Sequence, residues 1–129
     1  MLEKDGQKRD FILLSESEIR KALIGRRLVV DREVDWEPNK ISIAFAEDFL
    51  PDGSWIINKA IRAAITENGV WRIHDGQICT RVTQSPFGVK GRQEVCRQVW
   101  RDRSSGKIAM IGTLRILRDV LIFSSSPLK

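Results

Sequence analysis

The sequence predicts a mainly β protein. We expect an antiparallel up-and-down meander of about eight strands that forms a small barrel or a strongly twisted sheet, with one short N-terminal helix. Apolar and polar residues alternate over much of the chain after residue 26, which is the period of a half-buried strand. The dipeptides Asn68-Gly69 and Asp75-Gly76 are typical of tight hairpin turns. Only residues 15–24 carry a clear helical pattern.

Length and composition predict one globular domain. The chain has 129 residues, of which 42% are hydrophobic and 30% are charged. This composition is too apolar for a disordered chain and too charged for a membrane-spanning one. We expect residues 1–14 to be a loosely ordered lead-in, residues 15–124 to be a single β domain, and residues 125–129 to be a flexible tail. The N-terminal apolar stretch is too short for a signal peptide, so the sequence predicts no export signal.

The helix is predicted from its capping residues. Ser15 can accept a hydrogen bond from a first-turn N–H, and Glu18 can reach back to complete a capping box. Gly25 suits the left-handed conformation that ends many helices. The apolar stripe of this helix is formed by Ile19, Ala22 and Leu23.

The strands that follow are predicted from alternation of residue types. Residues 28–34 and 41–49 each place apolar side chains on one parity. Residues 55–66 also alternate and are interpreted as a strand, although residues 60–64 are compatible with a helix. A long strand over residues 107–117 and a last one near residues 120–123 complete the meander.

The turn dipeptides also predict a register. A two-residue loop at Asp75-Gly76 and a three-residue loop over residues 67–69 would bring the apolar side chains of the middle strands onto one face. The expected cross-strand pairs are Ile73 with Ile78, Trp71 with Thr80, and Ile65 with Trp71.

Two cysteines, Cys79 and Cys96, are the only ones in the chain. If they lie opposite each other across a hairpin, the neighbouring apolar residues fall on the core face, and a structural disulfide is the favoured interpretation. The alternative is a pair of unrelated reduced thiols. There is no C-x-x-C motif and His74 is the only histidine, so we expect no metal site and no cofactor.

Lys59 and Arg97 fall on the parity of the apolar face. A buried cation is costly unless it is paired, so one interpretation is a cavity in which Lys59 and Arg97 meet an anionic head group while Trp71 lines the wall. The alternative is that both side chains reach a rim, or that Lys59 pairs with Glu47 on the same face.

These residues predict a non-enzymatic binding or interaction module that holds a small apolar or anionic ligand or a protein partner. The formal charge of +5 keeps open a rival function, in which a basic β module binds nucleic acid. That surface would use Arg92, Arg97, Arg101 and Trp100. No constellation of catalytic residues is recognisable, and we assign no catalytic role.

Three short motifs resemble a family of small, uncharacterised bacterial proteins. The segments 49–53 and 69–79 fit F-x-x-D-G and G-x-W-x-x-x-x-G-x-x-C, and Cys96 supplies a later cysteine. The resemblance implies an exported, disulfide-bearing, lipocalin-like sheet of unknown function. It favours a periplasmic or secreted location, whereas the lack of a signal peptide in this sequence leaves a cytoplasmic one open.

Overall fold

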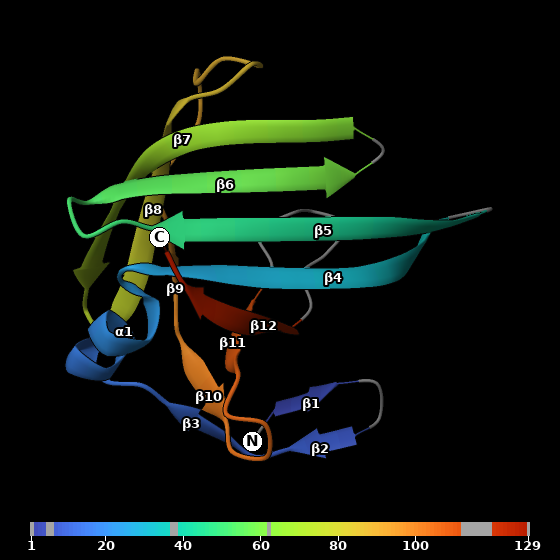
Figure 1. Cartoon of the computed structure of the whole chain (residues 1–129), viewed down its shortest axis with the longest axis vertical. Coiled ribbons are helices and arrows are strands. Elements are labelled where there is room, and N and C mark those ends of the chain that lie inside the picture. Colours follow the sequence, from blue (N-terminus) through green and yellow to red (C-terminus); the bar gives the residue numbers. More distant parts are fainter. Residues whose placement is uncertain (1, 5–6, 37–38, 62, 112–119, 129) are drawn as a thin grey trace.

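The computed structural model describes residues 2–4, 7–36, 39–61, 63–111 and 120–128 (Figure 1). Ten antiparallel strands form one curled, half-barrel sheet, and the described residues contain one short helix. The predicted fold class is therefore confirmed, with slightly more strands than expected. A separate hairpin of β1 (Leu2–Lys4) and β2 (Gln7–Arg9) precedes the sheet. None of the described helical segments is long and apolar enough to cross a membrane.

The strand order follows the chain over most of the sheet. The order is β3-β10-β11-β12-β4-β5-β6-β7-β8-β9. The first half of the chain supplies β3 (Phe11–Leu13), α1 (Glu16–Leu23), β4 (Arg26–Trp36), β5 (Asn39–Phe49) and β6 (Ser54–Ile61). The second half supplies β7 (Ala63–His74), β8 (Gln77–Gln84), β9 (Val95–Arg97), β10 (Trp100–Asp102), β11 (Ile108–Ile111) and β12 (Val120–Pro127).

The curl of the sheet brings its two ends toward each other. The edge strand β9 pairs with β8, and after a link of two residues the same chain continues as β10 between β3 and β11. The N–H of Leu14, just after β3, donates to the carbonyl of Val99 in this link, over 2.9 Å. Residues 95–102 therefore connect one end of the sheet with the other.

The predicted helix is confirmed. Ser15 is the N-cap and forms the reciprocal capping box with Glu18. Ile19 and Leu23 are fully buried, and α1 lies across one end of the curled sheet (Figure 1). Gly25 follows with a φ of 78°, and its N–H donates to the Phe49 carbonyl over 2.7 Å. The helix therefore closes one end of the half-barrel.

The hairpin between β7 and β8 has the predicted register. Ile73 pairs with Ile78 and Trp71 pairs with Thr80. Asp75 and Gly76 have φ values of 51° and 72°, as a tight two-residue turn of this kind requires.

The predicted turn at Asn68-Gly69 is wrong. β7 runs through it without a break, and the residues predicted as one strand over 55–66 form the β6–β7 hairpin instead. Ile65 accordingly pairs with Lys59 and not with Trp71. A register shift between Asn68 and Gly69 shows a bulge at this point. The open question of strand or helix is settled in favour of strands for residues 55–61 and 63–66, while residue 62 lies outside the described part of the chain.

Gly69 is needed for a close contact. A Cβ atom at this position would lie 2.0 Å from the backbone oxygen of Arg81, which no side chain can tolerate. Because Gly69 has no side chain, β8 can approach β7 closely at this point. Glycine, the residue type from which a turn was predicted here, instead marks a bulge within a strand.

The core fills the concave side of the sheet and the space beneath α1. The strand that was predicted over residues 107–117 begins as β11, and residues 112–119 lie outside the described part of the chain. Leu14 is buried and β3 belongs to the main sheet, while the proposed domain boundary at residue 15 stays a prediction. The buried apolar residues are Leu14, Ile19, Ala22, Leu23, Leu28, Val30, Phe45, Phe49, Trp55, Ile57, Ile78, Val82, Val99, Ile108, Met110, Leu121 and Phe123.

Candidate ligand-binding site

A cavity of about 310 Å³ lies between β6, β8, β9 and the connection that leads into β9. Its apolar wall is formed by Trp55 and Ile57 from β6 together with Val82 from β8. Lys59 and Arg92 add two cations to the same cavity. Its lining is completed by Thr80, Gly91, Gln93 and Val95. The volume is at the lower end of the range for ligand pockets, roughly 300 to 1,000 Å³, so the cavity suits a small ligand.

Both cations are held by one carboxylate. Glu67 on β7 is only 2% exposed and accepts a hydrogen bond from Lys59 Nζ over 2.6 Å. Arg92 donates to the two carboxylate oxygens over 2.8 and 3.2 Å. The hydroxyl of Ser85 donates to Oε2 over 2.7 Å. Two cations share one anion, so this cluster carries one net positive charge beside the cavity.

The same contacts set the ionisation of Glu67. Hydrogen bonds from Arg92, and then from Lys59 and Ser85, lower the pKa of Glu67 to about 2, although burial acts in the opposite direction. The carboxylate is therefore ionised at neutral pH and holds both cations in place.

Glu67 also holds both ends of the loop over residues 85–92. Ser85 begins this loop and Arg92 ends it, and both bond to the same carboxylate. Within the loop, the N–H of Phe87 donates to Ser85 Oγ over 3.2 Å, and the N–H of Arg92 donates to the Val89 carbonyl over 3.0 Å. One carboxylate on β7 thus positions the loop that borders the cavity.

A second buried network lies nearby in the core. Arg97 on β9 donates from Nη1 and Nη2 to the two oxygens of Glu47 on β5, over 3.1 and 2.6 Å. The indole N–H of Trp55 donates to the same carboxylate over 3.1 Å. Arg97 is 7% exposed and Glu47 is 3% exposed. Because Trp55 also lines the cavity, this ion pair fixes one of the cavity walls.

The structure brings together only part of the predicted site. Lys59 and Arg97 both point inward as predicted, but only Lys59 lines the cavity. The alternative pairing of Lys59 with Glu47 is wrong, because Lys59 pairs with Glu67 and Glu47 pairs with Arg97. Trp71 lies elsewhere: its indole N–H donates to the Leu50 carbonyl over 2.7 Å.

Trp71 belongs to the end of the half-barrel that α1 covers. The guanidinium of Arg20, on α1, lies 5.9 Å from the centre of its ring. Arg20 therefore stacks on the ring of Trp71, and the Leu50 carbonyl accepts the hydrogen bond from its indole N–H. Its predicted role as a cavity wall is therefore not supported by its surroundings.

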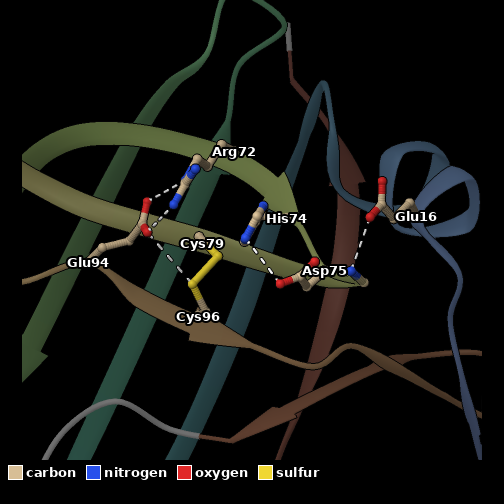
Figure 2. The surroundings of a disulfide bond; sticks show 8 residues. Glu16, Arg72, His74, Asp75, Cys79, Glu94 and Cys96 are labelled. Atoms are coloured by element: carbon tan, nitrogen blue, oxygen red, sulfur yellow. Dashed lines mark hydrogen bonds and ion pairs between the residues drawn. A yellow bond between two sulfur atoms is a disulfide. The ribbon is translucent and has the colours of Figure 1, made fainter.

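The predicted disulfide between Cys79 and Cys96 is confirmed (Figure 2). The two residues are directly opposite in the β8–β9 pairing, with Cα atoms 4.0 Å apart. Arg72 donates to both oxygens of Glu94 beside the bond, over 2.7 and 2.8 Å. The disulfide thus ties the edge strand β9 to β8 one residue before Arg97.

His74 lies near this disulfide on the exposed side of the sheet (Figure 2). Its Nε2 is 3.1 Å from a carboxylate oxygen of Asp75, and both side chains are largely exposed. The next residue, Gly76, donates its N–H to Glu16 on α1 over 3.1 Å. His74 is therefore a solvated residue beside the β7–β8 turn.

Sequence reasoning missed Glu67 and Arg92 as partners. Glu67 was assigned to a turn, although Ile65, Glu67 and Trp71 share one parity if the strand is continued through Gly69. That continued alternation is the signal that could have placed Glu67 on the concave face. Arg92 carries no such signal because it lies in an irregular connection.

The comparisons with known proteins identify no relative of this chain. No family model matches it, and neither a curated protein nor a solved structure matches it. The resemblance to small exported bacterial proteins and the location it implies therefore stay predictions.

Proposed function

We propose that this protein is a non-enzymatic binding module that holds a small anionic amphiphile in the cavity beside Lys59 and Arg92. The observation that carries the proposal is that the lining of this cavity has an apolar part and a positively charged part. One part of its lining is apolar, from Trp55, Ile57 and Val82, and its border carries two cations, Lys59 and Arg92. A ligand with a short hydrocarbon body and one negative charge matches both halves.

The charge of the border favours an anion. Glu67 neutralises one of the two cations and is already engaged by three donors. The remaining positive charge lies next to a partly enclosed cavity, where charge interactions are stronger than in bulk water. A carboxylate or similar head group would compensate this charge without removing Glu67.

The apolar wall favours a hydrocarbon body. Trp55 and Ile57 are buried against the core, and the Trp55 N–H is already bonded to Glu47. Trp55 therefore presents its ring to the cavity without an unpaired donor. Transfer of each methylene group from water to such a wall contributes about 0.8 kcal/mol.

The rival function as a nucleic-acid-binding module has weaker support. Arg97 is buried in its ion pair with Glu47, so it cannot contact a phosphate backbone. Arg92 is bonded to Glu67, and Arg101 lies at a different cavity. The four residues predicted for this function do not form one surface.

The test uses three ligands with the same hydrocarbon chain and different head groups. Binding of octanoate, octanol and octylammonium to the whole protein is measured by calorimetry at neutral pH. We expect octanoate to bind about tenfold more tightly than octanol, which corresponds to about 1.4 kcal/mol, and octylammonium to bind least. Equal affinities for octanoate and octylammonium would show that the border does not select an anion.

Lys59→Met supplies the matched test of the head-group contact. The variant keeps the length of the side chain and removes the charge, so octanoate should lose about tenfold in affinity while octanol does not change. Lys90→Met is the control, because Lys90 is an exposed lysine of the loop that does not line the cavity. An equal loss in both variants would contradict the proposal.

A further inference from the structure

A second cavity, of about 470 Å³, lies between the last turn of α1, the start of β4, the β10–β11 connection and β12. It shares no lining residue with the cavity beside Lys59. Its lining consists of Lys21, Ala22, Arg26, Arg101, Ser105, Gly106, Lys107, Ile108, Ser124 and Ser125. We refer to this set as the basic groove.

The basic groove gathers cations that have no acidic partner in the part of the chain that the structure describes. Lys21, Arg26, Arg101 and Lys107 line it together, and its lining contains no aspartate or glutamate. Among the described residues, none of the four has a carboxylate oxygen within 4.0 Å.

Cations elsewhere in the described chain are commonly paired. Arg27 binds Asp48 over 2.7 Å, Arg72 binds Glu94 over 2.7 Å, and Arg103 lies 3.3 Å from Asp10. Four unpaired cations around one hollow therefore differ from this pattern. Their mutual repulsion costs free energy that an anion in the groove would offset.

The two arginines are held in place by neutral groups and keep donors free. Arg26 donates from Nε to Ser125 Oγ over 2.5 Å, and Arg101 donates from Nη1 to the Gly106 carbonyl over 3.3 Å. A guanidinium has five N–H donors, so most of them stay available to a ligand. The hydroxyl of Ser124 adds another potential donor to the lining.

Part of this charge has a structural role. Lys21 lies in the last turn of α1, where a cation also offsets the partial negative charge of the helix end. The pKa of the exposed Glu18 is lowered mainly by its hydrogen bonds to Ser15, and the charges of Arg101 and Lys21 lower it further. Neither of these two roles involves Arg26 or Lys107. The two roles also do not explain why all four cations line the same groove.

We propose that the basic groove binds a phosphate-bearing anion. A phosphate monoester carries close to two negative charges at neutral pH and offers three acceptor oxygens. Guanidinium groups match this geometry with paired hydrogen bonds, and lysines add point charges. The volume of the groove leaves room for an organic body on the phosphate. Two sources share this chemistry: a soluble phosphomonoester and the head group of a phosphatidic acid.

The experiment compares two variants with the same loss of charge. Lys21→Gln with Lys107→Gln removes two exposed cations of the groove. Arg81→Gln with Lys90→Gln removes two exposed cations that line neither cavity. Thermal melting of both variants checks that the fold is intact. Binding of glycerol 3-phosphate is measured by calorimetry, and binding to phosphatidylcholine vesicles with and without phosphatidic acid is measured by sedimentation.

The groove variant should lose at least tenfold in affinity for the phosphate-bearing probe, while the control variant stays within about twofold of the unaltered protein. Binding of glycerol 3-phosphate would assign the site to soluble phosphomonoesters. Binding only to vesicles that contain phosphatidic acid would assign it to the lipid head group. The proposal is overturned if neither probe binds, if both variants lose affinity equally, or if only a single-stranded DNA oligonucleotide binds. Octanoate binding at the other cavity should not change in the groove variant, so the two proposals can fail separately.

Discussion

Glu47 and Arg97 lie 50 positions apart in the sequence and form a buried, two-pronged ion pair across the inside of the half-barrel. Breaking it from one side should be costly. Arg97→Met leaves Glu47 buried with only the Trp55 N–H as a donor, so we expect a loss of about 3 to 5 kcal/mol in the free energy of unfolding. Urea denaturation measures this loss.

A double variant separates the ion pair from simple packing. Glu47→Gln together with Arg97→Met keeps an amide oxygen for Trp55 and removes both charges. It should recover at least half of the stability that Arg97→Met loses, because no unpaired charge stays buried. A double variant as unstable as the single one would show that Arg97 acts mainly by filling space.

The disulfide should stabilise the fold and hold the edge strand. The 17-residue separation of Cys79 and Cys96 corresponds to a loop whose closure contributes about 3 kcal/mol. Replacing both cysteines by alanine should therefore lower the free energy of unfolding by about this amount. Reduction of the unaltered protein should have a similar effect, and a midpoint of unfolding that does not respond to reductant would contradict the bond.

The pKa of Glu67 gives the protein a specific acid sensitivity. This pKa is about 2 in the folded protein, against an ordinary value of 4.5. The depressed value means that the network of Glu67 stabilises the fold fully above pH 4.5, and that this contribution is lost as the pH falls from 4.5 toward 2. The pH profile of unfolding measured over this window tests it.

Glu67→Gln should remove this part of the pH dependence. The difference in unfolding free energy between neutral and acidic solution should be smaller in the variant than in the unaltered protein. Exposed Asp75→Asn is the control, because Asp75 lies at the β7–β8 turn, eight residues after Glu67, and pairs with His74 and not with Lys59, Arg92 or Ser85. An equal change in both variants would mean that Glu67 is not the responsible group.

Gly69 should not tolerate even the smallest side chain. Gly69→Ala would place a Cβ atom 2.0 Å from the Arg81 carbonyl oxygen and force β7 and β8 apart. We expect a loss of roughly 2 to 4 kcal/mol, whereas Asn68→Ala at the neighbouring position should cost much less. Similar losses in the two variants, measured by thermal unfolding, would contradict the close contact.

Local signals predicted the parts of the fold that depend on neighbouring residues. The capping box of Ser15 and Glu18 predicted the helix, and the Asp75-Gly76 turn fixed the register of β7 with β8. The pairing of Cys79 with Cys96 was a separate assumption about the next pair of strands, and it is confirmed. Asn68-Gly69 misled because a glycine that permits close approach of a backbone has the same sequence signature as one in a turn.

The candidate site was only partly predictable for a related reason. Alternation within β6 and β9 showed that Lys59 and Arg97 point inward, but a parity does not say which acid lies across the sheet. The partner of Arg97 comes from a strand 50 residues away, and Arg92 reaches Glu67 from an irregular loop. Such contacts depend on how far the sheet curls, which no local pattern encodes.

The most direct test of the proposed function is a map of contacts between bound octanoate and the protein. Nuclear Overhauser effects from the octanoate chain should reach the methyl groups of Ile57, Val82 and Val95, which line the cavity. Effects confined to the exposed methyl groups of Val29 and Val70, which do not line it, would contradict the proposal that this cavity is the binding site.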